Sequence, residues 1–172
     1  MRKTLQLMSA LALFFCALNL NAQNEAPKVT VKNVKGAAVT IIDSQYHFPY
    51  DISDNKQHVA IQAFGESQSF YWSENTGLIE VDGTVFAISD DGIMAGYYTN
   101  DQGMVVSGLW HPDMQQWQFL GMNPDYPEFF TDNPDYNNAW AMSNDGLHVG
   151  IMQFGPDWST TTYVWTPNDG YT

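Results

Sequence analysis

Acidic and amide side chains recur in three short turns of the sequence, where their oxygen atoms could bind a metal ion. The three pairs are Asp54-Asn55, Asp90-Asp91 and Asn144-Asp145. Ca²⁺ prefers such oxygen ligands, but none of the pairs lies in the Asp-x-Asp-x-Asp-Gly spacing of an EF-hand loop. Asp and Asn side chains also form hydrogen bonds with the backbone of their own turn. We expect that structural role here.

The stretch at residues 122–138 is a better candidate for calcium, because it is rich in carboxylates and amides. We predict that calcium, as an optional cofactor, would be held there by Asp125, Glu128, Asp132 and Asp135. The amides of Asn133, Asn137 and Asn138 would add neutral oxygen ligands. No other cofactor is predicted.

The aromatic residues fall into two groups, one that recurs and one that does not. Trp72, Trp110 and Trp165 occupy matching places, so we expect them to be core residues. The other group can stack on a sugar ring or pack against a protein, because an aromatic face offers a large apolar area with few rotamers. We predict that an unknown protein or glycan ligand binds at Tyr126, Phe129, Phe130, Tyr136 and Trp158.

Residues that could catalyse a reaction are scattered rather than grouped. The sequence contains no Gly-x-Ser-x-Gly, no His-Glu-x-x-His and no phosphate-binding glycine loop. Two carboxylates could hydrolyse a glycosidic bond, yet the acidic residues lie mostly in turns and no pair stands out. We predict no catalytic residue, and we expect that the protein is not an enzyme.

Short strands must position these residues, since no segment shows a helical spacing of apolar residues over three turns. The clearest set of strands begins at residue 86. Asp91-Gly92 supplies the positive φ that a tight hairpin turn requires. We predict four strands in this set, at residues 86–89, 93–98, 104–110 and 117–120.

Similar segments lie before and after this set of strands. Ser53 precedes Ser89 by 36 residues, and Ser143 follows Ser89 by 54 residues, which include an insertion loop at residues 122–138. Self-similarity of this period is typical of solenoids and propellers, and four short strands in each copy favour propeller blades. We predict an all-β fold of antiparallel four-stranded repeat units in a propeller-like arrangement. The three repeats cover residues 47–82, 83–121 and 139–172.

The predicted arrangement is incomplete in two respects. Three copies are too few to close a propeller, which usually has four to eight blades. The third copy also lacks the residues for a fourth strand after Trp165 and the following turn. We therefore expect either a fragment or a chain that assembles with other chains.

The N-terminus has the features of a targeting sequence. Arg2 and Lys3 precede a short apolar stretch that ends in a small-residue cleavage pattern, so residues 1–22 are predicted to be a secretory signal peptide. Its removal would remove Cys16, the only cysteine. Residues 23–46 are predicted to form an N-terminal strand segment. The mature protein would be secreted, periplasmic or at the cell surface, with no membrane insertion.

The charge balance excludes several classes of partner. Without residues 1–22 the chain keeps four lysines against 19 carboxylates. Such a surface repels the phosphates of nucleic acids and anionic lipids. We therefore predict no nucleic-acid partner.

The best-preserved copy resembles a known family. Residues 87–96, Ala-Ile-Ser-Asp-Asp-Gly-x-x-Ala-Gly, followed by Trp110, resemble the HAF-type repeats of bacterial extracellular proteins. Residues 141–150 fit the same pattern. The first copy departs from it, since Lys56 replaces the turn glycine and Ala60 the later glycine. The resemblance implies an exported domain with a propeller-like fold.

Together these observations predict an exported, non-enzymatic β-repeat module for binding or scaffolding at the cell surface or outside the cell. Two alternatives remain open. The chain could be the non-catalytic or truncated part of a secreted glycan-active enzyme. It could also be a calcium-stabilised adhesion module.

Overall fold

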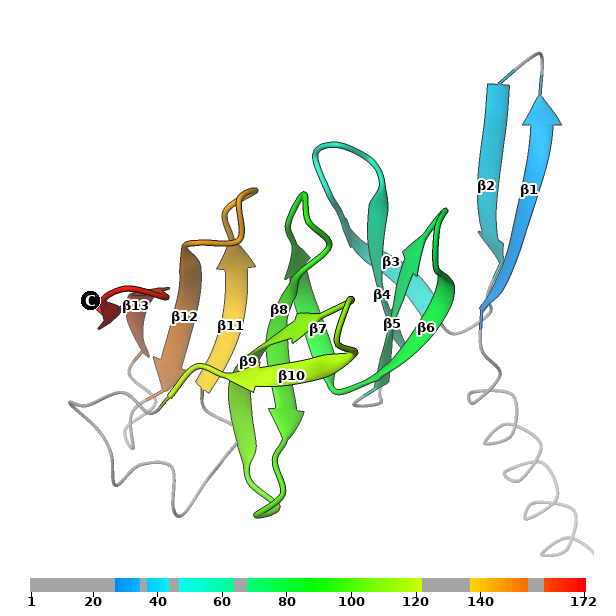
Figure 1. Ribbon diagram of the computed structural model, residues 1–172. Coiled ribbons are helices and arrows are strands. Elements are labelled where there is room, and N and C mark those ends of the chain that lie inside the picture. The colour runs from blue at the N-terminus through cyan, green and yellow to red at the C-terminus, as the bar shows by residue number, and fades with distance from the viewer. Residues whose placement is uncertain (1–26, 35–36, 44–46, 64–67, 122–136, 155–159) are drawn as a thin grey trace, which may run out of the picture. The chain divides into compact units, whose positions relative to one another are not determined.

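All described elements of the chain are β-strands joined by turns (Figure 1). The computed structural model describes residues 27–34, 37–43, 47–63, 68–121, 137–154 and 160–172. The predicted all-β class is confirmed. None of the described residues belongs to a helix that is long and apolar enough to cross a membrane. The chain divides into two compact units, Met1–His47 and Phe48–Thr172.

The first unit contains an antiparallel hairpin. β1 (Lys28–Val34) pairs with β2 (Ala37–Asp43), from Lys28 opposite Asp43 to Val34 opposite Ala37. Both strands are rich in valine, threonine or isoleucine, and these β-branched residues favour the extended backbone. The hairpin lies within the segment for which the sequence predicts strands.

The second unit contains three antiparallel sheets of four strands each, in which consecutive strands are neighbours. Sheet 1 consists of β3 (His47–Ile52), β4 (His58–Ala63), β5 (Gln68–Ser73) and β6 (Gly77–Asp82). Sheet 2 consists of β7 (Thr84–Ile88), β8 (Met94–Thr99), β9 (Val105–His111) and β10 (Gln116–Phe119). Sheet 3 consists of β11 (Asn137–Met142), β12 (Val149–Phe154), β13 (Thr160–Thr166) and β14 (Gly170–Tyr171). The predicted four-stranded antiparallel units are confirmed, and the described strands close no propeller ring.

The turn between the first two strands has the same construction in each sheet. The turn begins at a serine that forms two hydrogen bonds with one residue beyond the turn. The serine N–H donates to the carbonyl of that residue, and the serine hydroxyl accepts from its N–H. These serines are Ser53, Ser89 and Ser143. Three residues after the serine the backbone has a positive φ, at Lys56 (62°), Gly92 (79°) and Gly146 (70°). Lys56 therefore takes the left-handed conformation that glycine takes in the other two turns.

Sheet 2 has one residue fewer in this turn. Its serine N–H bonds to the carbonyl four residues later, whereas the serines of sheets 1 and 3 bond to the carbonyl five residues later. If the sequences of sheets 2 and 3 are aligned on their turn serines, the second strand of sheet 2 is therefore displaced by one residue relative to that of sheet 3. Ala95 pairs with Ala87, and Gly150 pairs with Ala141. Gly150 thus corresponds to Ala95, and not to Gly96.

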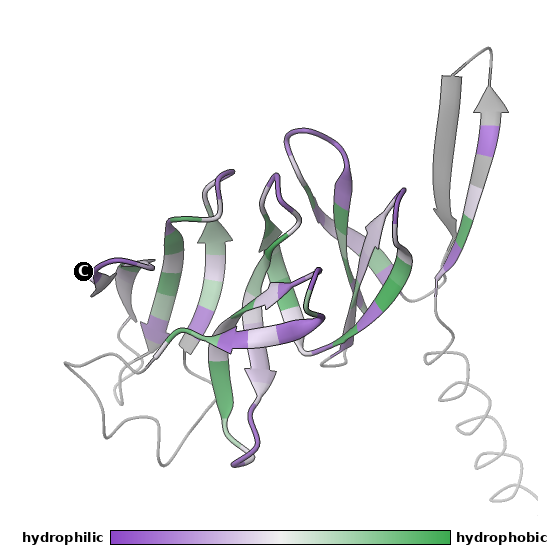
Figure 2. Cartoon of the chain, viewed as in Figure 1, coloured by the Kyte–Doolittle hydropathy of each residue, from purple (hydrophilic) through white to green (hydrophobic). Residues whose placement is uncertain are grey.

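Sheets 1 and 2 pack face to face around Trp110 of β9. The ring of Trp110 lies 5.4 Å from that of Tyr71 of β5, centroid to centroid. Ala60 of sheet 1 and Met94 of sheet 2 belong to the same buried cluster. The turns, in contrast, are hydrophilic (Figure 2). Burial of this apolar surface is the main term that holds the two sheets together.

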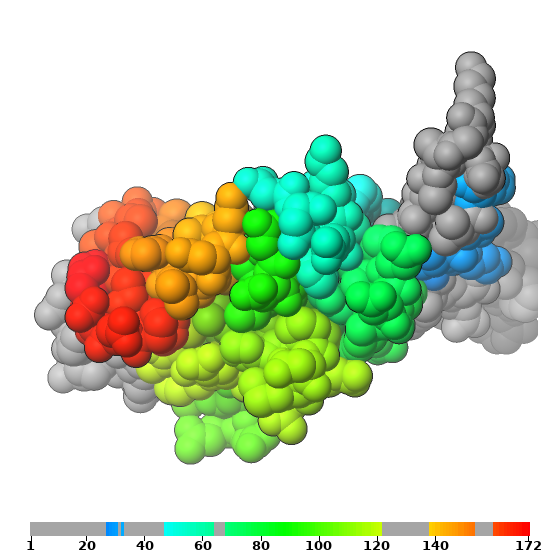
Figure 3. All heavy atoms as spheres, turned by 45° about the horizontal axis from the view of Figure 1, so that its top comes forward, coloured from blue at the N-terminus to red at the C-terminus, as the bar shows by residue number. Residues whose placement is uncertain are grey.

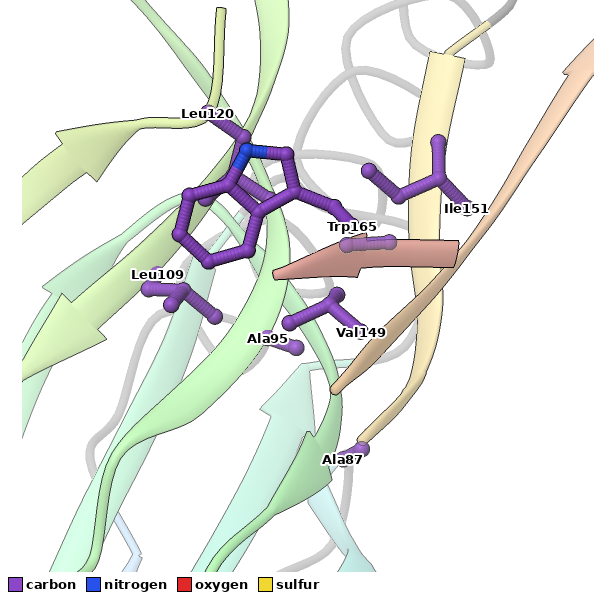
Figure 4. Packing of buried hydrophobic residues seen from close by; sticks show 8 residues of the cluster. Ala87, Ala95, Leu109, Leu120, Val149, Ile151 and Trp165 are labelled. Atoms are coloured by element: carbon purple, nitrogen blue, oxygen red, sulfur yellow. The ribbon is translucent and has the colours of Figure 1, made fainter. Parts of the chain in front are cut away.

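Sheets 2 and 3 pack in the same manner around Trp165 of β13. The Trp165 indole lies beside Leu109 of sheet 2 and Leu120, the residue that follows β10 (Figure 4). The prediction that the recurring tryptophans are core residues is confirmed, because Trp72, Trp110 and Trp165 are 9%, 3% and 7% exposed.

Sheet 3 has the fourth strand that the sequence analysis expected to be missing. β14 pairs with β13, and Val164 and Thr172 exchange two backbone hydrogen bonds of 3.1 and 2.9 Å. The expectation was wrong because it assumed a strand as long as the predicted strand at residues 117–120. Gly170, the first residue of β14, follows the turn and has a φ of 71°, and two residues are enough to pair.

Candidate functional site

Five aromatic side chains from all three sheets form one patch, which we name the aromatic face. Phe48 and Tyr50 belong to β3, Phe86 to β7, Tyr97 to β8 and Trp140 to β11. Phe86 lies at the centre. Its ring centroid is 4.1 Å from that of Trp140 in a stacked arrangement, 5.5 Å from Tyr50 and 5.8 Å from Tyr97.

The aromatic face is partly open to solvent. Phe48, Tyr50 and Trp140 are 39%, 40% and 40% exposed, and Phe86 and Tyr97 are half-buried. Burial of apolar rings stabilises a fold, so this exposure is not explained by folding. Contiguous exposed apolar patches mark binding surfaces on soluble proteins.

A β-bulge places Phe86 at the edge of sheet 2. Val85 pairs with Gly96 and Ala87 with Ala95, so Phe86 is an extra residue in β7. In a regular strand Val85 and Ala87 would face the same side of the sheet. Here Val85 packs in the cluster with sheet 1 and Ala87 in the cluster with sheet 3. Phe86 lies between the two packed faces, as bulges re-aim a side chain.

Trp140 occupies a corresponding bulge in sheet 3. It is the extra residue between Ala139 and Ala141 of β11. Ala139 is buried against sheet 2, whereas Ala141 is exposed. Trp140, Phe86 and Tyr50 each precede the turn serine of their sheet by three residues. One sequence position therefore supplies a ring to the aromatic face from every sheet.

Gly96 makes room for the bulge in β7. A Cβ atom on Gly96 would lie 1.9 Å from the carbonyl oxygen of Thr84. No side chain fits at this distance from rigid backbone, so β7 can approach β8 closely only opposite a glycine.

Asp51 follows Tyr50 on β3, and its carboxylate forms hydrogen bonds within the protein. One oxygen of Asp51 accepts the N–H of Ile52 and the other that of Ile88, both at 2.9 Å. The second bond joins β3 to β7. The five members of the face carry no charge.

A second candidate is a pocket of about 360 Å³ beside the turn between β8 and β9. Its lining residues are Tyr98, Asn100, Asp101, Gln102, Met104, Val106 and Phe119. Burial, and then the negative charge of Asp101, raises the pKa of Tyr98. A raised pKa keeps the phenol protonated and makes it a poor nucleophile. Tyr98 also stacks on Trp117, with ring centroids 5.0 Å apart.

The acidic turns meet one another without forming a metal centre, and they adjoin in Figure 3. Asn55 donates its backbone N–H to the Asp90 carboxylate at 2.8 Å and its side-chain amide to the Asp90 carbonyl at 2.6 Å. The N–H of Asp90 donates to the Asn144 carbonyl at 2.8 Å, and the Asn144 amide donates to the Asp54 carboxylate. Within the described part of the chain, no three His, Cys, Asp or Glu side chains are placed to hold a metal ion.

Two of the turn side chains also bind their own turn. Asn55 accepts the N–H of Gln57 at 2.9 Å, and Asp145 accepts that of Leu147 at 3.0 Å. The hydroxyl of Ser143, and then the Leu147 N–H, lowers the pKa of Asp145. The structural role expected for the turn side chains is confirmed for these two.

The site residues selected from the sequence lie outside the described residues. They are the aromatic residues Tyr126, Phe129, Phe130, Tyr136 and Trp158 and the acidic residues Asp125, Glu128, Asp132 and Asp135. A ligand site and a calcium site at these positions therefore stay predictions.

Sequence reasoning missed the aromatic face, although a signal was present. An aromatic residue stands three positions before each turn serine, as Tyr50, Phe86 and Trp140. Recurrence alone assigns such residues to the core, as it does the tryptophans. For Phe86 and Trp140, the bulges show that the rings lie at sheet edges.

Comparisons with known proteins find no relative of this chain. No family model, no curated protein and no solved structure gives a significant match. The resemblance to HAF-type repeats rests on the motif residues alone.

Proposed function

We propose that this protein is an exported, non-enzymatic binding module, that its three sheets are blades of a propeller-like arrangement, and that the aromatic face binds a neutral glycan. One observation carries the proposal. Tyr50, Phe86 and Trp140 come from the same position of three sheets and meet in one partly exposed patch. A ring that served only the core would lie on a covered sheet face rather than at an edge.

A sugar ring matches this surface in shape and polarity. One side of a pyranose presents C–H groups that can pack on an aromatic ring, while its hydroxyl groups lie around the rim. Tyr50, Tyr97 and Trp140 combine a flat apolar ring with an O–H or N–H at the ring edge. The stack of Phe86 on Trp140 holds both rings in place before a ligand arrives, and such preorganisation raises affinity.

The charge of the chain disfavours an anionic ligand. The protein carries 19 acidic residues against six basic ones, a net charge of −13. An acidic polysaccharide or a nucleic acid would be repelled. The Asp51 carboxylate next to the face already accepts two backbone N–H groups, so fewer of its lone pairs remain for a ligand.

Glycan binding can be measured directly. An array of neutral oligosaccharides, followed by calorimetry on the best ligand, should give binding by the wild-type protein. Trp140→Ala and Phe86→Ala should each weaken the affinity about tenfold or more, or ~1.4 kcal/mol. Met114→Ala removes a large exposed apolar side chain in the turn after β9, where Met114 is 56% exposed, and should leave the affinity unchanged.

Three results would contradict the proposal. The first is that no neutral glycan binds. The second is that Trp140→Ala and Phe86→Ala bind as tightly as the wild type, which would place the ligand elsewhere. The third is turnover of a polysaccharide, which would show an enzyme. A titration with chelator present tests separately whether calcium takes part.

A further inference from the structure

The pocket beside the turn between β8 and β9 lies apart from the aromatic face. Adjacent residues of β8 supply the two surfaces, since Tyr97 contacts Phe86 of the aromatic face and Tyr98 lines the pocket of about 360 Å³. Adjacent side chains of a strand point to opposite faces of the sheet. The turn lies at the end of sheet 2 away from the three acidic turns (Figure 1). The pocket is therefore a separate candidate site, which glycan binding at the aromatic face does not use.

The apolar part of the pocket lies on one face of sheet 2. Val106 of β9 pairs with Tyr98, and Phe119 of β10 pairs with Gly108, two residues beyond Val106. Residues two apart on a strand share a face, so Tyr98, Val106 and Phe119 lie on the same side. Val106 is 2% exposed, but Phe119 is 44% exposed. An apolar group of a ligand that covered the Phe119 ring would gain from its removal from water.

The aromatic side of the pocket is held in place by contacts within the protein. The Tyr98 and Trp117 rings are stacked within 8° of parallel, and the Trp117 indole N–H donates to the Asp82 carbonyl at 2.7 Å. Gly108 lets both rings lie close to β9, since a Cβ atom there would be 2.8 Å from Tyr98 and 2.9 Å from Trp117. Tyr98 is therefore preorganised, and preorganisation raises affinity.

The turn at the rim of the pocket carries its only charge. The Asn100 side-chain oxygen accepts the N–H groups of Gln102 and Met104, each at 3.0 Å, and so holds the turn. Asp101 is the one charged residue that lines the pocket. No hydrogen bond within the described part of the chain engages the Asp101 carboxylate or the Tyr98 hydroxyl. Both groups can therefore bond to a ligand.

The potential in the pocket is negative. Burial, and then the negative charge of Asp101, raises the pKa of Tyr98, so the carboxylate lies near enough to act on the phenol. The field that disfavours a phenolate favours a cation at the same place. No Lys or Arg follows Lys56 in the sequence. Sheet 2 therefore contains no ammonium or guanidinium group that could neutralise Asp101.

We propose that this pocket binds a small primary amine that carries an apolar chain. The ammonium group donates to the Asp101 carboxylate and to the Tyr98 hydroxyl oxygen, and the chain packs on Val106 and Phe119. An ammonium has three donors and no acceptor, which matches a site with two free acceptors. Aromatic rings such as those of Tyr98 and Phe119 also attract a cation. The ligand is small, since the pocket is near the lower limit of ligand sites, roughly 300–1,000 Å³.

Three probes with the same chain and different charge test the proposal. They are hexylamine, 1-hexanol and hexanoate, which are positive, neutral and negative. Binding is followed by NMR of methionine methyl groups, assigned with Met104→Leu and Met114→Leu. Hexylamine should shift the methyl signal of Met104, which lines the pocket, and not that of Met114 in the turn after β9. Hexanol should bind about five- to tenfold more weakly, and hexanoate more weakly still.

Matched variants separate the local carboxylate from the net charge. Asp101→Asn should weaken hexylamine binding about five- to tenfold and leave hexanol binding unchanged. Asp113→Asn removes the same charge from an exposed position at the other end of β9 and should leave the affinity for hexylamine nearly unchanged. Phe119→Ala should weaken both probes several-fold, because it removes apolar contact area. Trp140→Ala, which alters the aromatic face, should bind hexylamine as the wild type does.

Four results would overturn the proposal. The first is that hexylamine does not shift the Met104 signal. The second is that hexanol binds as tightly as hexylamine. The third is that Asp101→Asn and Asp113→Asn weaken hexylamine binding equally, which would show an effect of net charge alone. The fourth is that Trp140→Ala abolishes the binding, which would place the amine on the aromatic face.

Discussion

Trp165 and Trp140 belong to the same sheet but lie in opposite environments. Trp165 of β13 is buried against sheet 2, and Trp140 of β11 is 40% exposed. The difference comes from the backbone. Trp165 lies in a regular stretch of strand whose face is covered, whereas Trp140 is the extra residue of a bulge. Both positions recur in the sequence, so recurrence alone does not distinguish a core residue from a surface residue. The local geometry of the strand makes that distinction.

The largest predicted effect tests this difference with one residue type. Trp165→Ala should lower the free energy of unfolding by about 3–5 kcal/mol, because it leaves a cavity between sheets 2 and 3. Trp140→Ala should lower it by only about 1 kcal/mol, mainly through loss of the stack on Phe86. Urea unfolding followed by circular dichroism measures both. Equal losses would show that the rings of the aromatic face are part of the core.

A smaller effect concerns the bulge that turns Phe86 outward. Gly96→Ala should destabilise the protein by about 1–3 kcal/mol, because the new Cβ would lie 1.9 Å from the Thr84 carbonyl oxygen. It should also weaken glycan binding, since β7 must move. Gly150→Ala is the control. The sequence pattern aligns Gly150 with Gly96, but its Cβ would meet no atom closer than 3.4 Å.

The two glycine variants should therefore differ, and thermal unfolding followed by calorimetry would show it. Similar losses of stability would contradict the one-residue displacement between sheets 2 and 3. If Gly96→Ala leaves the glycan affinity unchanged, the bulge in β7 is not needed for the proposed binding site.

The smallest predicted change in stability concerns a turn, which belongs neither to the buried core nor to the aromatic face. Lys56→Gly should raise the free energy of unfolding by up to about 1.5 kcal/mol. A left-handed conformation costs an L-residue ~1–2 kcal/mol, and the greater chain entropy of glycine offsets ~0.5–1 kcal/mol of the gain. Glycan affinity should not change. A lower melting temperature would mean that the Lys56 side chain makes a contact worth more than its strain.

Local signals in the sequence predict much of the fold. Asp91-Gly92 identifies a hairpin turn because a tight turn needs a positive φ within a few residues. The tryptophans identify the core because large rings are costly to leave in water. The shorter turn of sheet 2 cannot be found in this way, since the serine can bond to the fourth or the fifth residue and only strand pairing decides between them.

The candidate site was harder to predict than the fold. The sequence directs attention to non-recurring aromatic residues such as Tyr136 and Trp158, which lie outside the described residues. Phe86 and Trp140 are recognisable as recurring aromatics, but their direction depends on bulges. A bulge is a property of two strands together, so one strand read alone does not reveal it.

The hydrogen bonds among the three turns have a consequence for how the protein unfolds. Asn55 links sheet 1 to sheet 2, Asp90 links sheet 2 to sheet 3, and Asn144 links sheet 3 back to sheet 1 through Asp54. In a linear array each unit contacts only its neighbours, and the terminal units can fray independently. Here an outer sheet cannot detach without losing contacts with both of the others. The circuit of turns should therefore make the three sheets open together, as one cooperative unit.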